Sequence, residues 1–233
     1  MTSLASLLGA WPAIVAAIAA AVLPRQAKPK HRVGLAVVAA LSVLLVQWLW
    51  PGAADATVAE GDEWPHLLNV LIGLPLLGAA IVLFIPRQML TLLRGFTYLV
   101  FGASFVVSLW LLATPMTVGW HFQYIQDWIP AAGIRYHVAV DGISVWLVLL
   151  TTFTTPIAAF SSFGSIKKRI KELCVAYLVL QAAMLGTFVA LDLFLFYVFW
   201  ELMLIPMFLL IGIWGGPNKV YAAVKFFLFT MTG

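Results

Sequence analysis

The chain has 233 residues, of which 64% are hydrophobic and only 9% are charged. Soluble domains carry roughly 25% charged residues, so this composition excludes an ordinary soluble protein and indicates an integral membrane protein. The formal net charge is +4, but the basic residues lie in short loops between apolar runs, which is typical of membrane topology and does not indicate a nucleic-acid-binding protein.

The sequence consists largely of apolar runs, each long enough to cross a membrane. A helix rises about 1.5 Å per residue, so about 20 residues cross a hydrocarbon core of ~30 Å. Lipid offers no partners for backbone hydrogen bonds, and no run alternates as a barrel strand does, so we expect an all-α, polytopic bundle of transmembrane helices. The expected spans are residues 4–23, 33–50, 67–85, 95–113, 139–160, 173–191 and 193–213, and an eighth run begins near Val220.

The loops between these runs differ in charge in a regular order. Every odd-numbered loop is basic, and every even-numbered loop is acidic or neutral. The positive-inside rule therefore predicts that the odd-numbered loops lie in the cytoplasm and that the N-terminus lies outside. A basic cluster follows the first run and no basic residue precedes it, which favours a retained span over a cleaved signal peptide. The basic loops contain Arg25, Lys28, Lys30 and Arg32; Arg87 and Arg94; Lys167, Lys168, Arg169 and Lys171; and Lys219.

The longest loop runs from Thr114 to His137 and mixes aromatic with polar residues. This mixture is typical of a segment that lies on the outer face of the membrane or packs on neighbouring helix ends. An ordered loop without regular structure fits the pattern equally well. The aromatic and polar residues include Trp120, His121, Phe122, Tyr124 and Trp128.

Glu201 lies in the middle of the run LFLFYVFWELMLIPMFLLIGIW (Leu193–Trp214). A carboxylate near the membrane midplane costs a few kcal/mol, and such residues usually have a function. Pro206 follows five residues later and weakens the local helix ladder. An acid beside a helix irregularity at this depth indicates proton or ion handling. The structural alternative is a protonated carboxyl that only hydrogen-bonds a neighbouring helix.

Five further positions lie in or beside the apolar runs. Lys225 is close enough to the cytoplasmic edge for its side chain to reach the interface, so structural and functional roles fit it equally. Gln181 is expected to hydrogen-bond a neighbouring helix. Asp141 fits an interfacial cap as well as a role in ion transfer, whereas Asp192 is expected to cap the helix that follows it. Pro156 predicts a kink, with nearby threonine hydroxyls available to bond freed carbonyls.

The sequence contains none of the common cofactor-binding motifs. It has no GxGxxG, GxxxxGK[ST], HExxH or CxxC pattern. Its single cysteine, Cys174, excludes an internal disulfide and a cysteine-based metal site. The four histidines are scattered through loops and span edges. We therefore expect no redox cofactor and no metal ion in this chain.

Three stretches of the sequence carry a resemblance to a known family. They are YHVAVDGIS (Tyr136–Ser144), ALDLFLFYVFWELMLIPMFLLIGIWGG (Ala190–Gly216) and YAAVKFFLFTMTG (Tyr221–Gly233). Together they resemble the M-type membrane subunits of bacterial proton-translocating NADH:quinone oxidoreductase, respiratory complex I. The string FWELMLIPM followed by AxxKFFxxT is the most specific part of this resemblance, which extends roughly from Leu67 to the C-terminus.

The resemblance implies an antiporter-like helix bundle that moves protons through a chain of buried charged residues. The key acid of the family corresponds to Glu201, and a further buried polar member corresponds to Lys225. The resemblance also implies that NAD, FMN, iron–sulfur clusters and quinone are bound by partner subunits rather than by this chain. The implied partners are antiporter-like neighbours and small subunits of the membrane arm, in the bacterial cytoplasmic (inner) membrane.

The sequence departs from the family pattern in three respects. Residues 1–62 add two spans, so we expect an N-terminal extension of two transmembrane helices ahead of the antiporter-like module at 63–233. The chain stops inside its eighth run whereas the family continues, so we expect a fragment or a truncated product that lacks the lysine partner of the key acid. Many members carry a Glu near the position of Gln181, which implies that an accessory proton site is missing here.

The resemblance predicts that the protein translocates protons as electrons pass from NADH to quinone, with Glu201 and Lys225 as proton carriers and Asp141 and Gln181 as accessory candidates. A subunit of a multisubunit cation/proton antiporter or of a membrane-bound hydrogenase is the alternative, because these use homologous modules. A membrane anchor without transport activity is the third hypothesis. It predicts that Glu201 tolerates replacement by Gln, Ala or Leu.

Overall fold

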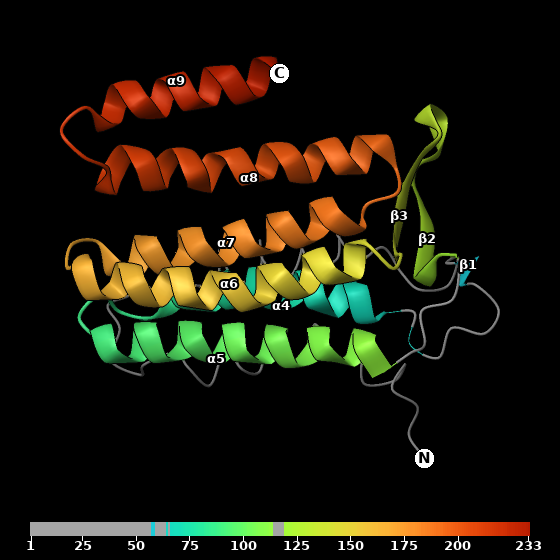
Figure 1. Cartoon of the computed structure of the whole chain (residues 1–233), viewed down its shortest axis with the longest axis horizontal. Coiled ribbons are helices and arrows are strands. Elements are labelled where there is room, and N and C mark those ends of the chain that lie inside the picture. Colours follow the sequence, from blue (N-terminus) through green and yellow to red (C-terminus); the bar gives the residue numbers. More distant parts are fainter. Residues whose placement is uncertain (1–56, 59–63, 65, 114–118) are drawn as a thin grey trace, which may run out of the picture. The chain divides into compact units, whose positions relative to one another are not determined.

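The computed structural model describes residues 57–58, 64, 66–113 and 119–233. Figure 1 shows its helices lying roughly parallel. They are α4 (Leu67–Phe84), α5 (Leu90–Trp110), α6 (Ser144–Ser165), α7 (Ile170–Val189), α8 (Leu193–Trp214) and α9 (Lys219–Thr232). The two spans expected at 4–23 and 33–50 lie outside the described residues.

Five of the described helices, α4 to α8, are long and apolar enough to cross a membrane, which confirms the helical-bundle prediction for this part of the chain. The expected bounds of α4 and α8 differ from the observed bounds by one residue. α5 begins at Leu90, five residues before the expected start, and continues into a short 3-10 helix, η1 (Leu111–Ala113). α9 begins at Lys219, next to the expected start of the eighth run.

A β-hairpin occupies most of the longest expected loop. The strands are β1 (Thr57–Val58), β2 (His121–Ile129) and β3 (Ile134–Val140), and a short helix η2 (Pro130–Ala132) connects the last two. They form an antiparallel sheet in the order β1-β2-β3. Gly133 completes the turn with a positive φ of 68°, a conformation that favours glycine.

The hairpin corrects one expectation from the sequence. The helical prediction holds for the spans, but the fifth span does not start at residue 139, because β3 continues to Val140 and α6 starts only at Ser144. The physical reason is strand pairing: Val138 and Val140 of β3 lie opposite Tyr124 and His121 of β2. On β2, Phe122 and Tyr124 are buried and their immediate neighbours are not, so the hairpin has one buried face. This buried face packs on the neighbouring ends of α4 and α7 in one apolar cluster.

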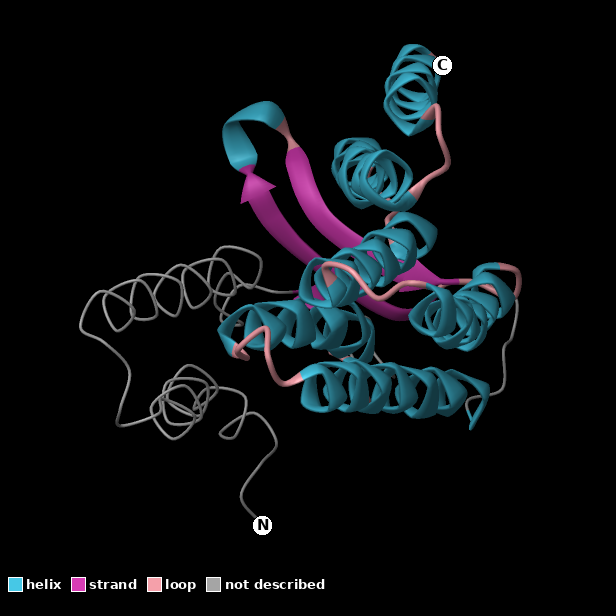
Figure 2. Cartoon of the chain, turned by 90° about the vertical axis from the view of Figure 1, so that its left-hand side faces the viewer, coloured by secondary structure: helices cyan, strands magenta, loops and turns pink. Residues whose placement is uncertain are grey.

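α7 is the central helix of the described bundle, as Figures 1 and 2 show. It contacts α4, α5, α6 and α8, and 67% of the residues in its apolar window are buried, compared with 22% in α8. Small residues allow the helices to approach closely. A Cβ at Gly78 in α4 would lie 2.8 Å from Val100 Cγ1 in α5, and a Cβ at Gly186 in α7 would overlap the ring of Phe199 in α8.

α6 continues without interruption through Pro156, which lies inside the helix. Hydroxyl groups around it bond to the backbone one turn earlier: Thr151 Oγ1 donates to Leu147 O at 2.8 Å and Thr155 Oγ1 donates to Thr151 O at 2.7 Å. A buried bond of 2.8 Å between Ser108 Oγ and Thr152 Oγ1 joins α5 to α6. These bonds satisfy hydroxyl groups that lipid could not satisfy.

Candidate functional site

α8, which carries Glu201, begins at a capped turn that is anchored to the hairpin. Asp192 Oδ1 accepts hydrogen bonds from two backbone N–H groups in the first turn of α8, at 2.9 and 3.1 Å, which confirms the expected helix cap. Asp192 Oδ2 accepts a third bond from the N–H of Arg135 in β3, at 3.3 Å. The N–H of Leu191 donates to His137 O at 2.9 Å. The sheet therefore fixes where α8 starts.

Glu201 lies in the middle of α8, on the exposed side of the helix. It follows Leu193 by eight positions and precedes Trp214 by thirteen, which places it about 12 Å and about 20 Å from the two ends. Tyr197 and Ile205, one turn away on either side, are 55% and 57% exposed. α8 packs on α7 and α9, and Glu201 itself is exposed. The structure therefore places a carboxylate at mid-span, on a face that no other described helix covers.

Lys225 is an exposed residue of α9, the helix that packs on α8. Its Nζ lies 5.8 Å from the centroid of the Tyr221 ring one turn earlier, within the range of a cation–π contact. The rings of Phe208 in α8 and Phe227 in α9 pack edge to face, with centroids 5.9 Å apart. The ion pairs among the described residues include neither Lys225 nor Glu201. The two candidates thus lie on neighbouring helices without forming an ion pair.

Gln181 is fully buried in α7. Neither its Oε1 nor its Nε2 has a hydrogen-bond partner among the residues that the structure describes. The expected bond to a neighbouring helix is therefore not formed within this part of the chain. Burying a polar group without a partner costs about 1–3 kcal/mol.

Asp141 forms a turn ahead of α6. Its Oδ1 accepts hydrogen bonds from the backbone N–H groups of Ser144 at 2.7 Å and Ile143 at 3.2 Å. The bonds from Ser144, and the weaker one from Ile143, lower the pKa of Asp141 below its usual range despite a small opposing effect of burial. Of the two roles that the sequence left open for Asp141, this geometry favours the interfacial cap.

A polar cluster under the hairpin was not predicted from the sequence. The hydroxyl of Tyr136 donates to Asn69 Oδ1 at 2.9 Å, and the hydroxyl of Tyr124 donates to Gln126 Oε1 at 2.8 Å. Burial raises the pKa of Tyr124 and Tyr136, so both remain neutral donors at physiological pH. Burial also lowers the pKa of His137, whose Nε2 lies 2.8 Å from Gln123 Nε2. The alternation of polar and apolar residues from 121 to 124 was the available signal.

Two further residues are buried within the helices. Pro206 is buried, and α8 continues through it to Trp214. Cys174 is a buried free thiol on α7. Within the described ranges, no three His, Cys, Asp or Glu side chains form a group that could hold a metal ion.

The C-terminal stretch of the chain matches a known family. Residues 190–233 match the family described as the transmembrane part of NADH:quinone oxidoreductase and the Mrp antiporter. This stretch contains α8 and α9. Both Glu201 and Lys225 therefore lie inside the match.

Relatives with known names extend the similarity over most of the chain. NADH-quinone oxidoreductase subunit M of Rhodobacter capsulatus is 45% identical over 174 residues, which cover 72% of this chain and 33% of the relative. NADH-ubiquinone oxidoreductase chain 4 of Marchantia polymorpha is 41% identical over 169 residues, which cover 71% of this chain and 34% of the relative. The chain thus spans about a third of the length of these relatives.

The fold agrees with the sequence similarity. A chain of respiratory complex I from Thermus thermophilus with bound NADH superimposes with a TM-score of 0.60 and 29% sequence identity. The superposition covers 71% of this chain and 33% of that one. The chain is therefore a multi-span membrane protein that is homologous, over 72% of its length, to subunit M of the NADH-quinone oxidoreductases.

Proposed function

We propose that this chain is a membrane-arm subunit of a proton-translocating NADH:quinone oxidoreductase and that Glu201 carries protons through it. The observation that supports this proposal most is the mid-span position of Glu201, inside the stretch that matches the family. An acid at this depth is too costly to serve only as part of a span. Lys225, on the neighbouring helix, is the second proton carrier. Asp141 and Gln181 are accessory positions at most, because Asp141 holds a turn and an amide does not titrate.

Glu201 would act by alternating between two surroundings. An apolar surrounding favours the protonated carboxyl, and a nearby cation favours the carboxylate. A conformational change driven from a neighbouring subunit alters this surrounding, so that the carboxyl takes up a proton from one side and releases it on the other. The exposed face of α8 around Glu201 is the surface on which such a change would act.

The proposal places the redox chemistry in partner subunits. NAD, FMN, iron–sulfur clusters and quinone bind there, and this chain contributes the proton carriers. Its partners are antiporter-like neighbours and small subunits of the membrane arm, in the bacterial cytoplasmic membrane with the N-terminus outside. Residues 1–62 would add two transmembrane helices to the module formed by residues 63–233.

A subunit of a cation/proton antiporter is the second candidate, because the description of the matching family also names the Mrp antiporter. The relatives described above are named as oxidoreductase subunits, which favours the first candidate. The two differ in their energy source, so a test must supply NADH and measure proton movement in the same membranes.

The test is NADH-driven proton uptake in inverted membrane vesicles that contain the assembled complex. We expect Glu201→Gln to reduce the uptake rate below about a tenth of the wild-type rate, because the amide has a similar shape but cannot carry a proton. The matched control is Asp127→Asn, at an exposed acid of the hairpin whose ion pair with Arg135 spans 3.4 Å. The control should pump normally.

Assembly must be measured together with pumping. NADH oxidation with a soluble electron acceptor and the amount of complex in the membrane report on assembly independently of proton movement. Normal uptake in an assembled Glu201→Gln complex would remove Glu201 from the proton route. An absence of NADH-driven uptake in the wild type would favour the antiporter.

A further inference from the structure

The bundle end opposite the hairpin concentrates most of the positive charge of the described residues. Figure 1 shows that the α4–α5, α6–α7 and α8–α9 connections all lie at this end. One acid, Glu172, accompanies the basic residues there within the described ranges. The basic residues are Arg87, Arg94, Lys167, Lys168, Arg169, Lys171 and Lys219.

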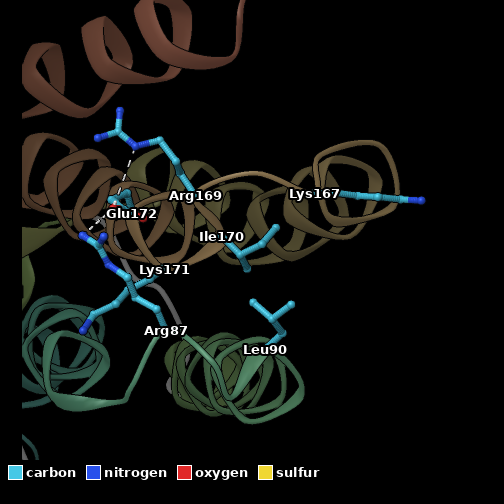
Figure 3. Close-up of a pocket in the computed structure, with 7 residues that line it drawn as sticks. All are labelled: Arg87, Leu90, Lys167, Arg169, Ile170, Lys171 and Glu172. Atoms are coloured by element: carbon cyan, nitrogen blue, oxygen red, sulfur yellow. Dashed lines mark ion pairs between the residues drawn. The ribbon is translucent and has the colours of Figure 1, made fainter.

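A pocket of about 280 Å³ lies among these residues, between the starts of α5 and α7. Four cationic side chains and one carboxylate line it, which leaves three positive charges without a counter-charge in the pocket. Figure 3 shows Arg87 and Arg169 approaching Glu172 from two sides, whereas Lys167 extends away from them. The pocket therefore has a cationic lining in which Glu172 neutralises one of the positive charges.

The cations of this pocket differ in how strongly they are engaged. Arg87 Nη2 pairs with Glu172 Oε1 at 2.8 Å. Lys171 Nζ donates to two carbonyl oxygens at the end of α4, at 2.7 and 2.9 Å. Arg169 Nε is 4.0 Å from Glu172 Oε1, at the limit of an ion pair, and Lys167 is in no ion pair among the described residues. Arg169 and Lys167 thus keep donors available for a ligand.

Arg169 also lines a second pocket, of about 360 Å³, together with Lys168, Trp214 and Lys219. Two of these residues already bond to the backbone: Trp214 Nε1 donates to Lys168 O at 2.9 Å and Lys219 Nζ donates to a carbonyl of α8 at 2.8 Å. Arg169 has a φ of 56°, a strained conformation for a residue other than glycine. It therefore lies between two cationic pockets, in a backbone conformation that its own side chain does not favour.

Apolar surface lies directly beside these cations. Met89, Leu90 and Leu92 are 52%, 44% and 52% exposed, and Leu90 lines the first pocket. α5 and α7 both begin here and are both candidate spans, so the pocket lies where the hydrocarbon of a bilayer meets its headgroups. A ligand with a phosphate group and acyl chains matches both surfaces, whereas free phosphate matches only the cations.

We propose that the two pockets around Arg169 bind a phosphate group, with Arg169 as the principal contact and Lys167 and Lys168 beside it. An anionic phospholipid headgroup is the source that the apolar surface favours. The planar guanidinium of Arg169 can bond two phosphate oxygens at once. Acyl chains of the same lipid would lie against Leu90 and Leu92. This site does not depend on the proposed proton route, which lies at mid-span.

The test uses the purified 233-residue chain, stripped of lipid in detergent. Dioleoyl phosphatidylglycerol, dioleoyl phosphatidylcholine and inorganic phosphate are added separately, and binding is measured by native mass spectrometry and by the thermal unfolding midpoint. We expect phosphatidylglycerol to bind and to raise the midpoint, and phosphatidylcholine not to. Arg169→Gln should weaken binding roughly fivefold, the effect of one cation at a membrane surface.

The matched control is Arg135→Gln, which removes one exposed cation at the hairpin end and should leave binding unchanged. Arg169→Lys keeps the charge and should retain part of the affinity. If Arg169→Gln does not fold, the double variant Lys167→Gln, Lys168→Gln provides the same comparison. A response to inorganic phosphate as strong as that to phosphatidylglycerol would support the phosphate site and assign it to free phosphate.

Two results would overturn the proposal. One is equal binding of phosphatidylglycerol by Arg169→Gln and Arg135→Gln. The other is an absence of binding or stabilisation with both phosphatidylglycerol and phosphate. In either case the basic residues would only set the membrane topology.

Discussion

α7 and α8 follow each other in the chain and contact each other, yet they differ strongly in how much of each helix is buried. In α7, 67% of the residues in the apolar window are buried, and in α8 only 22% are. Each helix has a polar residue near its middle: Gln181 is buried without a partner among the described residues, and Glu201 is exposed. The comparison teaches that hydropathy identifies spans but does not say which span is buried in the bundle and which one exposes a titratable group.

The largest effect is expected where the two helices meet. Gly186→Ala would place a Cβ into the ring of Phe199, and overpacking of this kind costs about 1–3 kcal/mol. We therefore expect a clearly lower thermal unfolding midpoint in detergent. Gly212→Ala is the control, because its new Cβ would lie 3.6 Å from Ala223 Cβ, an ordinary contact. Equal midpoints for the two variants would show that α7 and α8 are not closely packed at Gly186.

The next prediction compares how Gln181 and Glu201 affect stability and proton uptake. Gln181→Leu removes two buried polar atoms that have no partner among the described residues, and it should raise the stability by about 1–2 kcal/mol. Glu201→Leu changes an exposed position, so it should leave the unfolding midpoint nearly unchanged while it abolishes proton uptake. Unfolding midpoints of both variants and NADH-driven uptake measure the contrast. A loss of stability in Gln181→Leu would mean that the Gln181 amide has a partner beyond the described residues.

A smaller effect is expected at the start of α8. Asp192→Ala removes a helix cap and the bond to the N–H of Arg135, and loss of a cap costs about 1 kcal/mol. Asp127→Ala removes an exposed ion pair with Arg135 instead and should change the stability by less than about 0.5 kcal/mol. Hydrogen exchange in the first turn of α8 would show the difference directly. Equal exchange in both variants would contradict the capping role.

The smallest expected effect is a pH dependence of the backbone bond between Leu191 and His137, which holds the start of α8 to the hairpin. Burial lowers the pKa of His137, Asp192 raises it and Arg135 lowers it again, with a net shift below the usual 6.5. The folded protein therefore binds fewer protons, so its stability is complete above about pH 6.5 and decreases as the pH falls through the lowered pKa. We expect the Leu191 amide, which bonds His137 O, to exchange faster at acidic pH after correction for the intrinsic rate. His137→Gln should remove this dependence, and amides in α7 should not show it.

Features that depend on a short stretch of sequence were predicted well. The spans follow from the length of apolar runs, so α4 and α8 were placed to within one residue. The cap at Asp192 was predicted because a cap is set by the residue and the turn that follows it. The central position of Glu201 in its helix was read from the same run.

Features that depend on packing were not predicted. The hairpin was missed because its alternation is short, and because Val138 and Val140 read equally well as the start of an apolar span. The expected partner of Gln181 is absent from the described residues, since no rule of spacing says which side chains face it across a helix interface. The exposure of Glu201 likewise depends on how α7 and α9 pack on α8.

The bonds at the two ends of α8 determine where this helix can pivot. Its first turn is held by the Asp192 cap, by the N–H of Arg135 and by the Leu191–His137 backbone bond. Its last residue, Trp214, is held to the α6–α7 connection by one bond from its indole. If α8 tilts, it would therefore rotate about its first turn, which is held by more bonds than its last residue. The displacement would be greatest at Trp214, and Glu201 would move only part of that distance.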